Sequence, residues 1–444
     1  MEIKQFYDTN LAHASYAVLS GNEIALIDPA RDPDQYFEFA KEKNAKITAV
    51  IETHPHADFV SSHLEISKKT GADIYVSSLL NPFYNFIPFD EGNELKLGNI
   101  FLIPMNTPGH SPDSISILIR DENGKDYAIA TGDTLFVGDV GRPDLREKAG
   151  AINKTRDELA RMMYSTINEK LLKLSDDILV YPAHGAGSLC GKATSTDTFT
   201  SIGRERKENY ALQKMNEDSF VNELLNEQSY IPKYFGYDVE LNRKGAPDFE
   251  ESVKNVVRLN SADEIKNDVI IIDSRSKEDF SQEHIKCSVN LSDDLKFESW
   301  LGTIVSPDEK FYLIADTEEN LEMLIRRAAK IGYELLIEGA LVYKKCANNE
   351  SSGKLDLNSF KNEPDKFTVL DVRNYPEIKK QKIFNNSLSI PLNELRDRYK
   401  EIPSDKPVVV HCAAGYRSAA AASLLENFLE CKVFDLSDEI KNFL

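Results

Sequence analysis

The pattern of apolar and polar residues in the first half of the chain alternates between two periods. Short apolar, β-branched runs bounded by polar or glycine-containing segments are typical of buried strands. Strands are predicted at 24–28, 48–51, 73–76, 100–103, 127–130 and 178–181. The segment 155–174 carries apolar residues at helical spacing, and we interpret this stripe as core packing.

The second half of the chain contains an internal repeat. An apolar run that ends in Asp273-Ser-Arg275 recurs about one domain length later and ends in Asp371-Val-Arg373. Each copy continues with a helical pattern and another strand, which predicts α/β units with a parallel sheet. A chain of 444 residues is too long for one hydrophobic core. Polar joins at 242–248 and 351–354 predict domains at 1–245, 250–350 and 353–444.

Four of the predicted strands lead into a side chain that can bind a metal. His54, His110, Asp133 and His184 each follow such a strand. α/β folds build their sites at the carboxyl ends of strands. A lone His in this context is more often structural. Four such residues in the same context predict a metal site.

The segment His54-Pro-His56-Ala-Asp58-Phe59 bears on the number of metal ions. It resembles the THxHxDH motif of the metallo-β-lactamase superfamily, except that Phe59 stands where the motif has its final His. Hydrolytic members use two zinc ions. The second ion would need Asp58, residue 59 and His184, and a phenyl ring cannot bind it. Phe59 therefore disfavours two-metal hydrolysis.

A single metal ion is the alternative. His54, His110 and Asp133 form the two-His-one-carboxylate set of non-haem Fe(II) oxygenases, which leaves positions open for substrate and O₂. Neighbouring groups would then orient the ligands or relay protons. These groups are His56, Asp58 and His184.

Longer motifs make the resemblance more specific. Residues 25–32, 53–60, 107–111, 132–145 and 181–192 resemble the persulfide dioxygenases, a branch of the same superfamily. The resemblance implies an αββα sandwich and one Fe(II) per chain, held by His54, His110 and Asp133, with O₂ as co-substrate. Phe at position 59 is familiar among bacterial members fused to rhodanese domains, so it fits this branch.

Two residues near these motifs are candidates for substrate contact. Arg142 lies in a loop bounded by Gly and Pro, and Cys190 lies in a loop rich in Gly and Ser. A structural role is the alternative for each. We interpret His13 and His63 as structural.

A second candidate site is a cysteine loop at 406–418. Cys412 lies between a buried apolar run and an Ala-rich helix, whose N-terminus and loop amides can stabilise a persulfide. Gly415 permits a tight turn, and Arg417 supplies a fixed cation. The loop resembles the CxxGxR active-site loop of rhodanese sulfurtransferases. That resemblance implies catalytic roles for Cys412 and Arg417, with Gly415 and Tyr416 as substrate-binding candidates.

The corresponding loop of the preceding repeat has no cysteine. Asp316 and two glutamates make this loop acidic, so it would repel an anionic sulfur species. We predict a rhodanese-like domain without sulfurtransferase capacity. Cys287, Cys346 and Cys431 are interpreted as small buried residues.

Composition limits the cellular compartments and the classes of partner that we expect for this protein. A net charge of −20 argues against nucleic acid, whose phosphates would be repelled. The first residues do not form a secretory signal, and no apolar run is long enough to span a bilayer. Five cysteines do not suggest a disulfide framework. We therefore expect a cytoplasmic protein without nucleic-acid or membrane partners.

These observations predict a mixed α/β protein made of a metallo-β-lactamase αββα sandwich and two rhodanese-like domains. We expect it to oxidise a low-molecular-weight thiol persulfide to sulfite and to form thiosulfate at Cys412, in sulfide detoxification. The expected partners are that persulfide, sulfite and further copies of the chain in a homo-oligomer. Two alternatives stay open: a metal-dependent thioester hydrolase of the glyoxalase II kind, and a rhodanese sulfur carrier whose metallo domain is non-catalytic.

Overall fold

The computed structural model describes residues 1–146, 154–192, 195–226 and 228–443 and divides into two compact units. The first unit comprises Met1–Ser252 with Ala329–Gly332, and the second comprises Val253–Ala328 with Tyr333–Leu444. The domain boundaries expected near 245–250 and 350–353 stay predictions.

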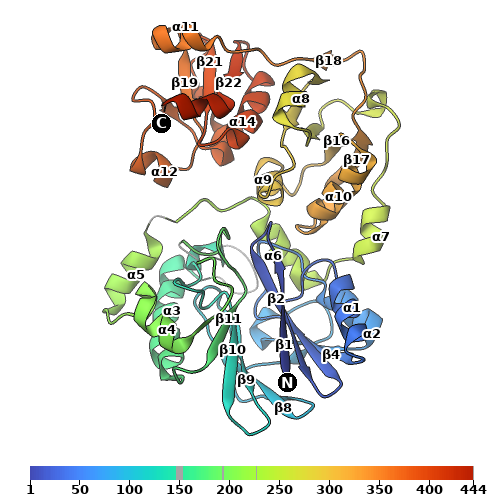
Figure 1. Cartoon of the computed structure of the whole chain (residues 1–444), viewed down its shortest axis with the longest axis vertical. Helices are drawn as coiled ribbons and strands as arrows, with labels where there is room; N and C mark the ends of the chain where they lie inside the picture. Colours follow the sequence, from blue (N-terminus) through green and yellow to red (C-terminus); the bar gives the residue numbers. More distant parts are fainter. Residues whose placement is uncertain (147–153, 193–194, 227, 444) are drawn as a thin grey trace. The chain divides into compact units, whose positions relative to one another are not determined.

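Two six-stranded sheets form the centre of the first unit (Figure 1). The first sheet has the order β1-β2-β3-β4-β5-β6 and the second has the order β12-β11-β10-β9-β8-β7. The strands of the first sheet are β1 (Glu2–Asp8), β2 (His13–Ser20), β3 (Glu23–Ile27), β4 (Lys46–Ile51), β5 (Asp73–Val76) and β6 (Ile87–Pro88). Those of the second are β7 (Leu95–Leu97), β8 (Ile100–Asn106), β9 (Ile115–Arg120), β10 (Asp126–Gly132), β11 (Leu179–Pro182) and β12 (Thr200–Ser201).

Apolar side chains from both sheets share one core, which shows that the sheets pack face to face. Ile27 and Ile51 of the first sheet belong to the same buried cluster as Ile117 and Ala130 of the second. Helices α1 (Asp34–Glu42) and α2 (His63–Thr70) pack on the outer face of the first sheet. Helices α3 (Arg156–Glu169) and α5 (Glu217–Leu225) pack on the outer face of the second. This confirms the predicted αββα sandwich.

Three further helices follow α3 in the sequence, and the last of them crosses the boundary between the two units at residues 252 and 253. They are α4 (Ile202–Glu208), α6 (Phe235–Lys244) and α7 (Phe249–Lys254). Asn242 of α6 donates hydrogen bonds to the carbonyl oxygens of His56 (2.9 Å) and Phe59 (2.8 Å). The helix therefore fixes the segment that carries His54.

Two four-stranded parallel sheets form the second unit, in the orders β15-β13-β16-β17 and β20-β19-β21-β22. The first contains β13 (Ile270–Asp273), β15 (Ser288–Asn290), β16 (Phe311–Ala315) and β17 (Ile337–Val342), and the second contains β19 (Thr368–Asp371), β20 (Leu388–Ser389), β21 (Val408–His411) and β22 (Val433–Asp435). A separate pair consists of β14 (His284–Ile285) and β18 (Asn349–Glu350). The helices are α8 (Lys277–Gln282), α9 (Phe297–Ile304), α10 (Glu318–Ala329), α11 (Leu357–Asn362), α12 (Tyr375–Lys380), α13 (Leu395–Arg398) and α14 (Tyr416–Glu426).

The internal repeat corresponds to one buried ion pair in each parallel sheet. Arg275 Nη2 lies 2.7 Å from Asp273 Oδ2, and Arg373 Nη2 lies 2.6 Å from Asp371 Oδ2. Each arginine also donates to the backbone carbonyl eight residues further along, over 2.9 Å in both copies. The Asp-x-Arg pair thus fastens the end of β13 or β19 to the segment after the next helix.

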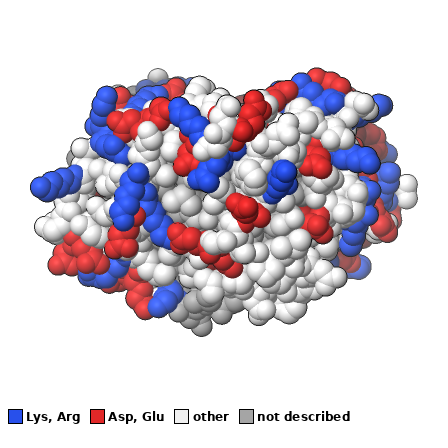
Figure 2. Space-filling view, turned by 90° about the horizontal axis from the view of Figure 1, so that it is seen from below, with Lys and Arg blue, Asp and Glu red and all other residues white. Residues whose placement is uncertain are grey.

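The helices and the surface charge bear on the expected absence of membrane and nucleic-acid partners. No helix among the described residues is long and apolar enough to cross a membrane. On the face shown in Figure 2, acidic and basic side chains are interspersed. This face therefore lacks the continuous basic surface that follows a phosphate backbone.

Candidate metal centre and cysteine loop

The first candidate site lies where β4 and β10 end and where β8 turns into β9. His54, His110 and Asp133 are buried there, and their ligand atoms lie within 4.8 Å of one another. Nε2 of His54 is 3.8 Å from Asp133 Oδ2, and Nε2 of His110 is 3.5 Å from the same oxygen. The three residues predicted as metal ligands are thus brought together.

Hydrogen bonds fix both imidazole rings from behind. His54 Nδ1 lies 3.0 Å from the hydroxyl of Thr53, which donates to Asp28 over 2.8 Å. His110 Nδ1 lies 3.0 Å from the carbonyl oxygen of Arg142. Such contacts at Nδ1 orient Nε2 for a metal.

The chain passes very close to itself here, and glycine makes this possible. Gly132 has φ +51°, and a Cβ atom on it would lie 2.4 Å from Thr53 Oγ1. A larger residue would displace either Thr53, which holds His54, or the start of the Asp133 turn.

Asp133 carries the charge that a cation would balance. Its Oδ1 accepts a hydrogen bond from His184 Nδ1 (2.8 Å), while its buried Oδ2 has no hydrogen-bond partner among the described residues. Burial opposes ionisation, but His184, His110 and His54 outweigh it and hold the pKa of Asp133 well below its usual value. An ionised, buried oxygen facing two imidazoles fits one metal ion.

The other predicted residues form two further groups around this centre. Asp58, His184 and Cys190 form one group within 4.8 Å, and His184 Nε2 is 2.7 Å from Asp58 Oδ2. His56 belongs to another group, with Nε2 3.1 Å from Asp28 and 3.9 Å from Glu52. His56 therefore pairs with carboxylates outside the His54 group.

Phe59 fills the space between imidazole rings. Its side chain is buried, and its ring centroid lies 3.8 Å from that of His13 and 4.4 Å from that of His56. Burial and the neighbouring His184 and His56 lower the pKa of His13 well below its usual value. His13 is thus a neutral packing partner of Phe59.

The second candidate site is the cysteine loop between β21 and α14. Cys412 is buried, and its Sγ accepts a hydrogen bond from the Gly415 amide (3.1 Å) and lies 3.6 Å from Ser418 Oγ. Gly415 has φ +94°, which turns the loop into the helix. The Gly415 amide at the N-terminus of α14 is therefore the hydrogen-bond donor to the sulfur, whereas the Ser418 hydroxyl donates to the Gly415 carbonyl oxygen.

Arg417 and Tyr416 have different positions after this turn. Arg417 binds Glu377 of α12 through two hydrogen bonds of 2.6 and 2.8 Å. Tyr416 is turned towards the preceding repeat, where burial and nearby Asp294 raise the pKa of its hydroxyl well above the usual value. Glu377 had no predicted role, because its partner lies 40 residues away in the sequence.

The matching loop of the preceding repeat lies between β16 and α10. Asp316 occupies the position after the strand, is exposed, and accepts a hydrogen bond from Asn320 over 2.6 Å. An acidic loop without a thiol has no group that could carry sulfur.

Comparisons with known proteins match one family to the part of the chain with the metal centre and another family to the two repeats. The Metallo-beta-lactamase superfamily profile covers residues 8–184, and the Rhodanese-like domain profile covers residues 258–343 and 355–444. A solved metallo-beta-lactamase from Staphylococcus aureus subsp. aureus COL is 30% identical, covers 77% of this chain and 99% of its own, and gives a TM-score of 0.68. The chain belongs to the metallo-β-lactamase superfamily.

Curated relatives within the superfamily differ in their chemistry. The hydroxyacylglutathione hydrolase GloC of Haemophilus influenzae is 27% identical over 206 residues, which are 42% of this chain and 85% of that protein. The mitochondrial persulfide dioxygenase ETHE1 of Homo sapiens is 27% identical over 164 residues, which are 36% of this chain and 59% of that protein. Because the two relatives are equally identical to this chain, sequence identity does not distinguish hydrolysis from persulfide oxidation, and the residues of the metal centre must be considered.

In this metallo-β-lactamase superfamily protein, the Arg142 side chain forms hydrogen bonds with other residues of the chain. Its guanidinium donates to both carboxylate oxygens of Asp144 (2.7 and 2.6 Å) and to the carbonyl oxygens of Leu189 (3.2 Å) and Ser229 (2.6 Å). These hydrogen bonds fix the loop in which the Arg142 carbonyl oxygen contacts His110 Nδ1. Its contribution to the site is therefore the position of that carbonyl.

Cys190 lies beside the metal-site residues and is buried. Burial and the carboxylates of Asp58 and Asp133 raise the pKa of its thiol well above the usual value. The residue is a protonated thiol at neutral pH, so nucleophilic chemistry would need loss of that proton.

Sequence reasoning gave no role to Asp28 and Glu52, although both lie in the site. Asp28 has φ +51° and accepts hydrogen bonds from the Thr53 amide and hydroxyl. Burial raises the pKa of Glu52 to about 8. The available signal was the position of each acid at a strand end, since Asp28 is the last residue of the predicted strand 24–28 and Glu52 follows the predicted strand 48–51.

Proposed function

We propose that this protein is a non-haem Fe(II)-dependent dioxygenase that oxidises a low-molecular-weight thiol persulfide to sulfite, coupled to rhodanese transfer that yields thiosulfate. The supporting observation is the separate group of His54, His110 and Asp133, with Phe59 in place of a second-site ligand. A ferrous ion bound by these residues would supply redox chemistry and open positions for persulfide sulfur and O₂.

Residues around the three ligands would keep the site in one protonation state. Burial disfavours the charged form of His184, but Asp133 and Asp58 raise its pKa well above the usual value. The imidazolium donates through Nδ1 to Asp133 Oδ1, which leaves Oδ2 directed towards His54 and His110. The His184–Asp58 pair also holds a proton at Nε2 that could protonate the departing thiolate.

The oxidation balances with one O₂ and one water for each persulfide. The outer sulfur is oxidised to sulfite, O₂ is fully reduced, and water supplies the third oxygen. The carrier thiol leaves with its inner sulfur unchanged.

The transfer step would occur at Cys412. Its thiolate attacks the outer sulfur of a second persulfide, whose S–S bond breaks as the carrier leaves as a thiolate. Sulfite then attacks the sulfur held on Cys412, which forms thiosulfate and restores the thiolate. The Gly415 amide lies 3.1 Å from Cys412 Sγ and supports the anionic sulfur.

Anaerobic reconstitution with Fe(II), followed by O₂ uptake with glutathione persulfide, tests the proposal. We expect O₂ uptake together with sulfite formation, and loss of bound iron in Asp133→Asn. Asp126→Asn, at a half-buried ion pair with Arg120, serves as the matched control and should retain iron. The proposal would be refuted if the iron-loaded protein consumed no O₂ in the presence of glutathione persulfide.

A thioester hydrolase is the second candidate, because Asp58, His184 and Cys190 could hold another ion. The hydroxyacylglutathione hydrolase relative supports this alternative. It requires two metal ions per chain and zinc-dependent cleavage of S-lactoylglutathione. One ion per chain with no thioester cleavage would eliminate it.

A further inference from the structure

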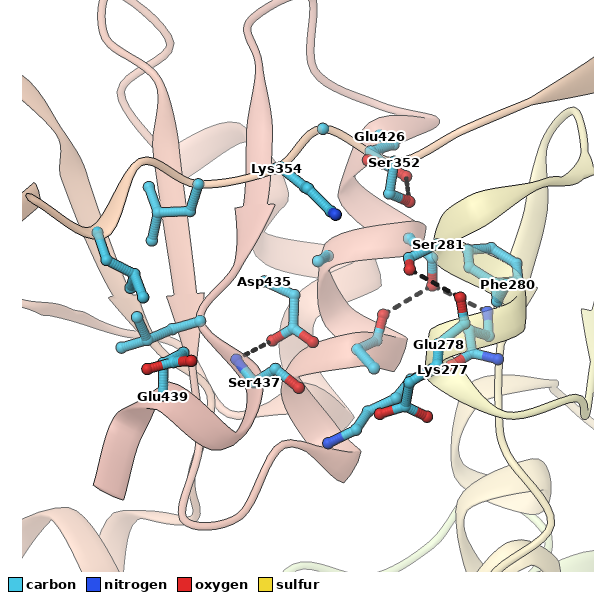
Figure 3. A pocket seen from close by; sticks show the side chains of 18 residues that line it. Lys277, Glu278, Phe280, Ser281, Ser352, Lys354, Glu426, Asp435, Ser437 and Glu439 are labelled. Carbon is cyan, nitrogen blue, oxygen red and sulfur yellow. Dashed lines mark hydrogen bonds between the residues drawn. The ribbon is translucent and has the colours of Figure 1, made fainter. Parts of the chain in front are cut away.

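The second unit contains a cavity of about 440 Å³ beside the cysteine loop (Figure 3). Its walls come from α8, from α14 and the end of β22, and from the segment 352–357. The volume lies in the range of small-molecule pockets. The cavity belongs neither to the metal centre nor to the groups that contact Cys412 Sγ.

Two carboxyl groups that face this cavity have raised pKa values. Burial raises the pKa of Asp435 to about 6 and that of Glu426 to about 7. Asp435 accepts a hydrogen bond from the Ser437 amide (2.8 Å), and Ser418 and the charge of Lys277 also lower its pKa. Glu426 accepts only a long hydrogen bond from the Ser352 hydroxyl (3.4 Å). A ligand cation in the cavity would offset the remaining cost of burying these carboxyl groups.

A lysine on the segment that also carries Ser352 lacks an anion among the described residues. The side chain of Lys354 reaches into the cavity in Figure 3, and no carboxylate of the described residues lies within ion-pairing distance of it. Lys277, the other lysine of the lining, is already paired with Asp438. The cavity therefore offers carboxylates to an ammonium group and one available ammonium to a carboxylate.

The cavity extends to the active-site loop. A Cβ atom on Gly415 would lie 2.8 Å from Lys277 Nζ and 3.2 Å from Ser437 Oγ, and both residues line the cavity. The amide of Gly415 is the donor to Cys412 Sγ. A molecule in this cavity would therefore lie next to the loop that carries the sulfur.

We propose that this cavity binds a zwitterionic low-molecular-weight thiol, an amino-acid or short-peptide thiol, with its ammonium group at Asp435 and Glu426 and a carboxylate at Lys354. This inference deepens the proposed function and rests on it for the role of the ligand as the carrier that serves Cys412. The carbon chain would lie along Ala419 and Ala422 of α14, which form an apolar wall.

The same lining disfavours coenzyme A. The acidic residues of the wall outnumber its lysines, and a carrier with several phosphates and no ammonium would be repelled. The acidic residues are Glu278, Glu426, Asp435 and Glu439. The cavity thus selects among carrier thiols by charge.

Titration calorimetry of the full chain with S-methylglutathione tests this inference. This probe keeps the ammonium and carboxylates, but its thioether can neither exchange sulfur with Cys412 nor bind a metal as a thiolate. We expect saturable binding that weakens about tenfold or more in Asp435→Asn/Glu426→Gln and in Lys354→Met, the loss of one charge-assisted contact. Glu430→Gln, an exposed carboxylate outside the lining, is the matched control.

Three results would overturn the inference: no saturable binding to the wild-type chain, unchanged affinity in Lys354→Met, or equal affinity for the N-acetylated probe. Lys354 is exposed, so its variant keeps the test valid even if the double variant fails to fold. The binding assay needs no O₂ uptake. A failed dioxygenase assay with intact binding would refute only the proposed function, and the reverse result would refute only the cavity.

Discussion

The ring of Phe59 lies against the ring of His13, with centroids 3.8 Å apart. This contact places an apolar side chain at the position where the superfamily motif has a metal-binding histidine. The neighbouring Asp58 and His184 remain close together, so the second group keeps its other members.

Phe59→His should therefore restore a second metal site. We expect the metal content, measured by inductively coupled plasma mass spectrometry after zinc loading, to rise from one to two ions per chain. Phe59→Leu, which keeps the apolar contact with His13 but offers no ligand, should stay at one ion. A histidine variant that also binds one ion would show that residue 59 does not control the stoichiometry.

Cys412→Ser should separate the two activities. The hydroxyl keeps the size of the residue but cannot accept sulfur at neutral pH, so thiosulfate formation should be lost while O₂ uptake stays within about twofold of wild type. Cys431→Ser, in the same domain, is the control and should form thiosulfate normally. Ion chromatography of the products measures both, and a wild-type thiosulfate yield from Cys412→Ser contradicts its role.

Glu377→Gln should strengthen the interaction with sulfite. Arg417 is bound by Glu377 through two hydrogen bonds, which neutralise the cation next to the Cys412 loop. Removal of that charge frees Arg417 for the anionic acceptor, so KM for sulfite should fall about threefold to tenfold with kcat little changed, an effect of about 1 kcal/mol. Glu401→Gln, whose exposed carboxylate binds Arg398, is the control. An unchanged KM would show that Arg417 does not receive sulfite.

His411 should make the chain less stable in mild acid. Burial lowers its pKa to about 4, so between pH 6.5 and pH 4 the unfolded chain binds a proton that the folded chain does not. The stability contribution is complete above pH 6.5 and is lost as the pH falls towards 4, by about 2 kcal/mol between pH 7 and pH 5.

Urea unfolding of wild type and His411→Gln at both pH values measures this effect. The variant should lose less stability between pH 7 and pH 5 than wild type, because Gln does not titrate. Equal losses in the two chains would show that His411 is not the group responsible.

The sequence predicts those parts of the fold in which an apolar run ends at a polar group. The strands that lead to His54, His110, Asp133 and Cys412 have this form, and the structure brings the first three together. Strand β1 was not predicted, because its residues alternate between half-buried and exposed and have no apolar run. Pairing with β2 determines that strand, and such pairing is a tertiary contact.

Site partners were harder to predict than ligands. Asp28 and Glu377 hold site residues across 25 and 40 positions of sequence, and no local pattern links such pairs. For Arg142 the sequence left substrate contact and a structural role open, and the structure shows its guanidinium bound to Asp144 and to the Ser229 carbonyl oxygen. Side-chain direction depends on packing that spacing does not describe.

The two Asp-x-Arg pairs have nearly the same geometry, although only one of the two corresponding loops contains a cysteine, Cys412. The ion pair that fixes the strand end is thus independent of the residues in the loop between the later strand and helix of each repeat. The acidic loop with Asp316 could consequently be replaced by the residues of the Cys412 loop. The new loop would again lie between a parallel strand and a helix. One chain could then host two sulfur sites of different design for direct comparison.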